Sequence, residues 1–284
     1  MIPDSQPPVI DTASKVTPFG VRFWDVLTQS AVQSGLSVTA FRPDAPLVRM
    51  PAFPNRVGVY VIQGVRGLTD FEMGSGDADF WQTAPPGKTY IVEVVDTVDR
   101  FLPCVFEATI PSHGLFQWPC AILGSPPVAP ADAVPLFSKP HRSLLGGMAL
   151  VRALLADPDT RKPVAWARLS ISMGSTILAE AISGLDGSVT AAFPFPERQE
   201  STAVPLADWA WTVNIYVAHL PPAGLWAYPD LCDLLNQNPA QVWSVYEPGG
   251  MQSPLGNQTL KYGRELILRS HRPDGSLLSE LYIT

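Results

Sequence analysis

Apolar and polar side chains alternate along several short stretches of the chain. The alternation is clear between residues 36 and 40 and between residues 165 and 172, and a period of two is typical of strands with one buried face. β-Branched runs at 59–62 and 89–95 are typical of strands in the core of a sandwich. An Asp-Gly step at residues 186–187 is a hairpin signal. The pattern predicts an all-β fold.

Only one segment, near residues 229–237, has a helical pattern. Pro229 suits the first turn of a helix, and Leu231, Leu234 and Leu235 recur at helical spacing. The chain contains 30 prolines, which interrupt helices because proline lacks an amide donor and clashes with the preceding turn. We therefore expect a single short helix.

The domain organisation follows from the places where the strand pattern is interrupted. Strands expected at 265–270 and 277–283 flank a Pro-Asp-Gly turn, which predicts a C-terminal hairpin. We expect four segments in all: an extended N-terminal arm of residues 1–17, a first β-sandwich domain of residues 18–110, a Pro-rich connection of residues 111–146, and a second β-sandwich domain of residues 147–284.

The charge of the chain excludes some classes of partner. The 284 residues carry a formal net charge of -7, which disfavours nucleic acids and anionic membranes because both are bound mainly through basic side chains. No window of about eighteen residues is uninterrupted and apolar, and the first residues lack the basic and apolar parts of a secretion signal. We expect no membrane insertion and a protein that is cytoplasmic at synthesis.

The three cysteines, Cys104, Cys120 and Cys232, form no CxxC pair. Any scheme of disulfides leaves at least one of them unpaired. We favour reduced, mostly buried thiols. Cys120 lies near His113 in a loop, but no helix N-terminus is predicted there to lower the pKa of the thiol, so we reject it as a nucleophile.

An acidic cluster offers oxygen ligands of the kind that calcium prefers. An EF-hand loop has glycine at its sixth position and glutamate at its twelfth, whereas these positions hold Ser75 and Trp81 when the count starts at Asp70. We therefore interpret the cluster as a solvated loop. Its members are Asp70, Glu72, Asp77 and Asp79.

Motifs for catalysis and cofactor binding are missing from the sequence. The run Gly174-Ser175-Thr176 does not form a Gly-x-Ser-x-Gly elbow, and neither a phosphate-binding loop nor a Rossmann fingerprint occurs. The histidines belong to no zinc pattern; they are His113, His141, His219 and His271. The sequence predicts no catalytic, cofactor-binding or metal-binding residue.

Tryptophan and arginine are the residue types that favour a binding role. Eight tryptophans could stack on sugar rings, but large aromatics more often serve as core or interface anchors; they are Trp24, Trp81, Trp118, Trp166, Trp209, Trp211, Trp226 and Trp243. Arginine outnumbers lysine 14 to 5. Arginine is enriched at protein interfaces, and codon bias is the competing explanation. The balance favours a subunit that is packed against others.

Two resemblances add to this interpretation. Residues 165–169, 184–189 and 193–197 resemble the immunoglobulin-like, carboxypeptidase-regulatory type of β-sandwich module. Further stretches resemble an uncharacterised family associated with gene clusters of phage-tail-like contractile injection systems; they are residues 19–25, 55–60, 67–72, 100–103, 114–116 and 263–270. The first resemblance implies an immunoglobulin-like sandwich. The second implies a structural particle subunit without known catalysis, and it supplies no functional residues.

Together these observations predict two immunoglobulin-like β-sandwich domains, a strand-containing C-terminal extension and one short helix. The expected function is that of a non-enzymatic structural subunit of a contractile, phage-tail-like particle, in its baseplate or a peripheral attachment, which is assembled from other subunits and released from the cell. The alternative is a glycan-binding module of the receptor-recognition or adhesin type, which predicts an exposed row of aromatics. A third reading is an enzyme whose carboxylates and histidines converge in one pocket from distant loops.

Overall fold

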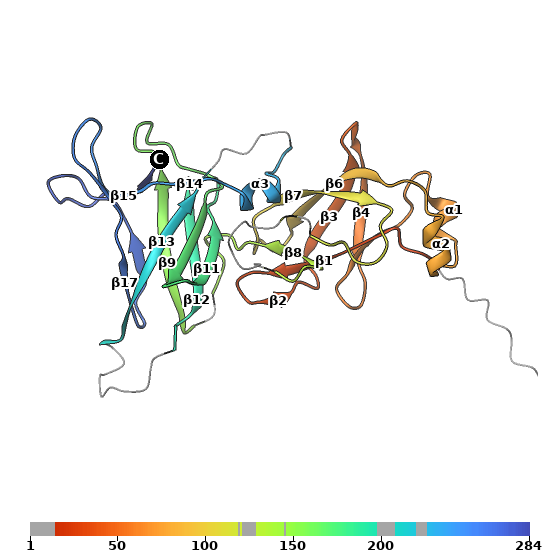
Figure 1. Cartoon of the computed structure of the whole chain (residues 1–284), viewed down its shortest axis with the longest axis horizontal. Coiled ribbons are helices and arrows are strands. Elements are labelled where there is room, and N and C mark those ends of the chain that lie inside the picture. The colour runs from red at the N-terminus through yellow and green to blue at the C-terminus, as the bar shows by residue number, and fades with distance from the viewer. Residues whose placement is uncertain (1–14, 119, 121–128, 145, 198–207, 220–225) are drawn as a thin grey trace, which may run out of the picture.

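The fold is built almost entirely from strands, as the alternating sequence pattern predicts (Figure 1). A computed structural model describes residues 15–118, 120, 129–144, 146–197, 208–219 and 226–284. These residues form two β-rich units that lie end to end along the long axis of the molecule. The expected N-terminal arm lies mostly outside the described residues. The all-β prediction is confirmed.

The first unit is one curled sheet with the order β2-β1-β5-β4-β3-β6-β7. The first half of β1 pairs with β5, and its second half pairs in parallel with β8. Therefore β1 joins the two parts of the sheet. The strands are β1 (Phe19–Asp25), β2 (Ser30–Ala31), β3 (Leu36–Arg42), β4 (Ala45–Pro54), β5 (Tyr60–Ile62), β6 (Lys88–Asp96), β7 (Cys104–Ile110) and β8 (Ala133–Leu136).

The second unit contains two separate sheets. One has the order β11-β10-β13-β14, with β17 also on β13, and the other has the order β12-β9-β19-β15-β16, with β18 also on β9. The strands are β9 (Met148–Ala156), β10 (Arg168–Met173), β11 (Thr176–Ile182), β12 (Ser188–Pro194), β13 (Ala210–Ala218), β14 (Pro239–Ala240), β15 (Val242–Tyr246), β16 (Gln252–Pro254), β17 (Gln258–Lys261), β18 (Leu266–Leu268) and β19 (Leu281–Ile283).

Alternate side chains of these strands fill the two cores. In the first unit, Phe23 of β1 packs edge-on against Tyr60, with ring centroids 5.3 Å apart. In the second unit, Val151 and Val189 of one sheet share a cluster with Leu169 of the other, and all three are fully buried. Residues from both sheets share this core, which is the arrangement of a β-sandwich.

Three short helices are present among the described residues, where the sequence predicts one. They are α1 (Thr69–Glu72), α2 (Ala78–Gln82) and α3 (Leu231–Leu235). The predicted leucines of α3 are buried, but the helix begins after Asp230, whose side chain caps it, and not at Pro229. The prediction of a single helix is wrong, because α1 and α2 are too short to show an apolar period.

The C-terminal strands add to the second unit through β9. Both β18 and β19 pair with β9 in parallel, and β19 also pairs with β15. Between them the chain turns tightly, with the Arg272 amide donating to Ser276 O at 2.9 Å and the Leu278 amide donating to Ser270 O at 2.9 Å. The last residues thus pair with an earlier strand. The antiparallel contact of the expected hairpin is the isolated bridge between His271 and Leu277, whereas β18 and β19 themselves pair with β9.

Candidate functional site

The junction between the units is built by a segment that crosses from the second unit to the first. In this crossing segment, residues 226–235, Pro229 accepts a 3.0 Å hydrogen bond at its carbonyl oxygen from the Val105 amide of β7. Trp226 packs edge-on against Phe41 of β3, with ring centroids 5.6 Å apart. The edge of the first sheet is therefore covered by residues that are far away in the sequence.

Helix α3 extends the core of the first unit into the junction. Leu231, Leu234 and Leu235 belong to the same buried cluster as the first-unit strands, and so do Trp166 and Ile182 of the second unit. Because one apolar cluster contains side chains from both units, separating the units would expose them to water.

Polar contacts reinforce this packing. Gln237 donates from Nε2 to Trp166 O at 2.5 Å and accepts at Oε1 from the Arg168 amide at 3.0 Å. Arg168 also donates from Nη1 to Leu235 O at 2.8 Å. These bonds satisfy backbone groups at the C-terminal end of α3 and at the start of β10, where unpaired groups would be costly.

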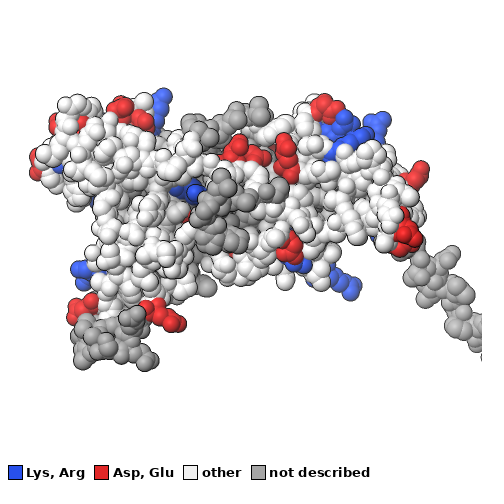
Figure 2. Space-filling view, in the orientation of Figure 1, with Lys and Arg blue, Asp and Glu red and all other residues white. Residues whose placement is uncertain are grey.

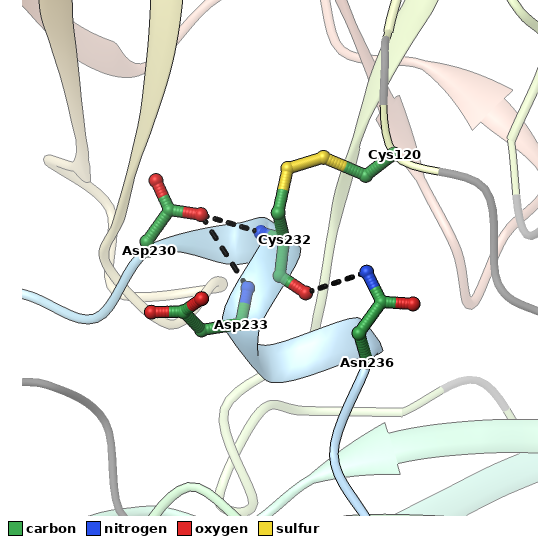
Figure 3. The surroundings of a disulfide bond; sticks show 5 residues. All are labelled: Cys120, Asp230, Cys232, Asp233 and Asn236. Carbon is green, nitrogen blue, oxygen red and sulfur yellow. Dashed lines mark hydrogen bonds between the residues drawn. A yellow bond between two sulfur atoms is a disulfide. The ribbon is translucent and has the colours of Figure 1, made fainter.

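A disulfide fixes α3 to the loop after β7 (Figure 3). Cys120 and Cys232 are paired with their Cα atoms 5.5 Å apart, a spacing that a disulfide spans without backbone movement. Asp230 caps the helix through the Cys232 amide at 2.8 Å. The expectation of three reduced thiols is thus wrong for these two cysteines. Cys104 is free and buried, and burial raises the pKa of its thiol to about 12, so it is not a reactive thiolate at neutral pH.

A second link joins the connection to β1. Arg142 donates to both carboxylate oxygens of the buried Asp25, at 2.7 and 3.1 Å, and its guanidinium lies 4.8 Å from the ring centroid of Phe101. Burial acts to raise the pKa of Asp25, but the hydrogen bonds from Arg142 and Thr28 outweigh it, so the pKa lies below its ordinary value. The pair is therefore charged at neutral pH.

A cavity of about 530 Å³ lies at this junction. Its apolar wall includes Leu102, Trp166, Leu185, Trp226 and Tyr228, and its polar lining consists of Lys139, His141, Asp186 and Ser188. An apolar cavity with a few polar groups is the usual form of a small-molecule site. Sequence reasoning missed it because its walls come from five separate parts of the chain.

The polar groups of the junction cavity have partners, either within its lining or in Asp99 beside it. Asp99 accepts a 2.8 Å hydrogen bond from His141 Nε2 and a further bond from Lys139, and these two contacts lower its pKa. Asp186 accepts from the Ser188 hydroxyl at 2.6 Å, and this bond lowers its pKa. The Ser188 hydroxyl thus donates to a carboxylate, and among the described residues it has no hydrogen bond to a histidine. This is not the arrangement of an activated nucleophile.

Gly187 sets the turn that brings Asp186 to the cavity. It has φ of +76°, and a Cβ atom there would lie 2.4 Å from Leu155 O. Only glycine fits a left-handed conformation with so close a backbone approach. The Asp-Gly turn signal in the sequence therefore marks a real constraint.

The acidic cluster 70–79 stabilises local structure. Glu72 is fully buried and accepts 2.9 Å hydrogen bonds from the amides of Gly64 and Val65, and Lys15 lies 3.4 Å away. Asp77 caps α2 by accepting from the Phe80 amide at 2.8 Å. The segment is helical where a solvated loop was expected. Within the described ranges, no three His, Cys, Asp or Glu side chains are placed to share a metal ion.

The other three histidines do not line the junction cavity. His113 packs against Trp81 with ring centroids 4.9 Å apart. His219 is half-buried, and burial lowers its pKa. His271 forms isolated bridges with Val245 and Leu277. Of the four histidines, only His141 lines the junction cavity.

Four aromatic rings gather in the second unit at one end of β13. Phe195 lies 5.6 Å from Trp211 and 4.7 Å from Tyr262, and Trp209 lies 6.3 Å from Trp211 and 5.9 Å from Tyr262, all between ring centroids. All four side chains are half-buried. We call this group the aromatic cluster.

Strand β4 exposes apolar side chains. Leu47 is 95% exposed and Phe53 is 63% exposed. The pairing of β3 with β4 shifts register in the part of β4 that contains Leu47, so strict alternation does not assign the two side chains to one face. Val57, just beyond the strand, is exposed as well. Large apolar side chains exposed along one strand are suited to an interaction surface.

Comparison with known proteins gives no relatives. No protein-family model matches the chain, and no curated protein or solved structure matches it. In the described part of the chain, no helix is long and apolar enough to cross a membrane. Function is therefore inferred from the surfaces and cavities themselves.

Proposed function

We propose that the protein is a non-enzymatic structural subunit of a contractile, phage-tail-like particle, placed in the baseplate or a peripheral attachment. The observation that carries this proposal is the exposed apolar surface along β4, with Leu47 and Phe53. Such a surface is suited to burial against another subunit. The kind of particle is inferred from the sequence resemblance.

The contacts at the junction resist movement between the two units, which supports a structural role. The shared core around α3, the Cys120–Cys232 disulfide and the Arg142–Asp25 pair all oppose movement of one unit against the other. Disulfides persist in oxidising surroundings, which is consistent with a particle that leaves the cell. The pairing of polar groups in the junction cavity supports a role without catalysis.

Purified particles provide the test. We expect mass spectrometry of intact particles to find this chain, and its absence from them would reject the proposal. A variant carrying Leu47→Asp and Phe53→Asp should fold but fail to be incorporated, because both side chains are exposed in the isolated subunit. Leu277→Asp is the matched control, since Leu277 is exposed on the second unit, and it should be incorporated normally.

A glycan-binding module is the second candidate function, and the aromatic cluster favours it. Half-exposed aromatic rings at the end of a sandwich offer flat apolar faces of the kind that sugar rings stack on. A glycan array tests this function. The glycan-binding function is supported if Tyr262→Ala abolishes binding and Tyr216→Ala does not. Tyr216 is the control, because it lies on the exposed face of β13. An array without hits removes it.

A further inference from the structure

A second cavity, of about 510 Å³, lies in the first unit and shares no lining residue with the junction cavity; we call it the end cavity. Met50 of β4, Leu68 before α1, Tyr90 of β6 and Ile110 of β7 line it, and these side chains are half-buried or buried. Prolines 85, 86 and 111 complete its apolar lining. The volume lies in the range of small-molecule sites, about 300–1,000 Å³.

Three cations, Arg42, Arg66 and Lys88, line the mouth of this end cavity. All three are exposed. Arg42 pairs with Asp44, whereas Arg66 and Lys88 have no ion pair with any described residue. None of the described residues that line the cavity is acidic. Figure 2 shows Lys and Arg side chains gathered over the β3–β4 end of the first unit, although the whole chain carries a net charge of -7.

Tyr90 adds an unpartnered polar group beside these cations. Its side chain is only 6% exposed, and its hydroxyl makes no hydrogen bond to another described residue. Burial raises the pKa of Tyr90, so the hydroxyl stays protonated at neutral pH and is a hydrogen-bond donor. The hydroxyl itself is not fully enclosed, so it can be reached from the cavity, and a ligand that accepts its hydrogen bond takes the place of water.

We propose that the end cavity binds a small anionic amphiphile. The anionic head group accepts hydrogen bonds from Arg66, Lys88 and Tyr90, and the apolar chain covers Met50 and Ile110. A ligand without an apolar part would leave this lining in contact with water, and one without a negative charge would leave the cations unpaired. Free fatty acids and alkyl phosphates share this chemistry. The inference stands whether or not the protein belongs to a particle.

Four eight-carbon probes separate the contributions of head group and chain: octanoate, octyl phosphate, octanol and octylamine. Isothermal titration calorimetry with the full-length protein should show saturable one-to-one binding of octanoate or octyl phosphate. The probe that binds more tightly identifies the preferred head group. Octanol should bind at least about tenfold more weakly, because a charge-assisted hydrogen bond contributes about 1.5–3 kcal/mol. Octylamine should not bind.

Variants then locate the site. Arg66→Gln combined with Lys88→Gln should weaken binding of the anion about tenfold or more, and Tyr90→Phe should weaken it about two- to tenfold. Lys261→Gln combined with Arg264→Gln removes the same charge from the exposed surface of the second unit and should leave binding unchanged. The midpoint of thermal unfolding should stay the same in both double variants, because all four side chains are exposed.

Three results would overturn the proposal. One is equal binding of octylamine and octanoate. Another is unchanged affinity for the anion in the Arg66→Gln, Lys88→Gln variant. The third is a response to a glutamate-rich peptide with none to either anionic amphiphile, which would assign the cations to a protein partner.

Discussion

The two units complete their cores in different ways. The second unit is closed by strands that follow its first strand in the sequence, since β18 and β19 pair with β9. The first unit takes α3 from a segment 95 positions beyond the end of its last strand, β8 (Ala133–Leu136), and takes Trp166 and Ile182 from the second unit. A domain boundary placed in the sequence therefore does not coincide with the limit of either hydrophobic core.

The two units also differ in how deeply their ion pairs are buried. Arg142 and Asp25 are largely buried and join the connection to the first unit, whereas Arg152 and Glu265 lie on the surface between β9 and the start of the C-terminal strands. Buried pairs are costly to break, and exposed pairs contribute little. The comparison yields four predictions, from the largest effect to the smallest.

Shortening a leucine side chain of α3 should have the largest effect on the free energy of unfolding. Leu234→Ala removes a buried side chain from the shared core, and such changes cost about 2–5 kcal/mol. Amide hydrogen exchange should show loss of protection in β6 and β7 of the first unit. Leu260→Ala, in the core of the second unit, is the control, and it should reduce protection there. Equal effects of both variants on both units would contradict the difference described above.

Removal of the disulfide should have a slightly smaller effect. Replacing Cys120 and Cys232 with serine should lower the free energy of unfolding by about 2–4 kcal/mol, because the cross-link restricts the unfolded chain. Denaturant unfolding with and without a reductant measures this loss of free energy. The wild-type protein should lose the same amount in reductant, while Cys104→Ala should not change the response to reductant.

The Arg142–Asp25 pair should make stability depend on pH. The pKa of Asp25 is lower in the folded state than the usual value of about 3.9, so its contribution is fully present above that value and is lost as pH falls through the folded pKa. Asp25→Asn should cost about 1–3 kcal/mol at pH 7 and much less in acid. A cost that is the same at both pH values would contradict this assignment.

The surface pair should have the smallest effect. Arg152→Ala should change the free energy of unfolding by at most about 0.5 kcal/mol, because Arg152 and Glu265 are both well exposed. Added salt should reduce even this difference. A loss above about 2 kcal/mol would mean that the second unit also depends on a charged contact.

Sequence patterns predicted those parts of the fold that depend on nearby residues. The period of two identified strands such as Leu36–Arg42, and the leucine spacing identified α3. Strand β8 was missed in the Pro-rich connection, because all four of its residues are buried and a parallel strand buried on both faces shows no alternation. The helix α2 carries a local signal, since Asp77 occupies a capping position.

The candidate sites could not be predicted, because their residues meet only after folding. Asp99, His141 and Asp186 come from three loops, and the spacing of such residues along the chain contains no information on their distance in space. The pairing of Cys120 with Cys232 spans 112 positions and depends on where the crossing segment lies. The cationic mouth of the end cavity likewise combines Arg42, Arg66 and Lys88 from separate elements.

The origin of α3 also determines when the first unit is finished during synthesis. A ribosome releases the N-terminal half first, and domains usually fold as they emerge. Here Leu231, Leu234 and Leu235 must leave the exit tunnel before the hydrophobic interior of that half is complete. The first unit therefore completes its core only after much of the second unit has been translated, and the second unit in turn waits for β18 and β19.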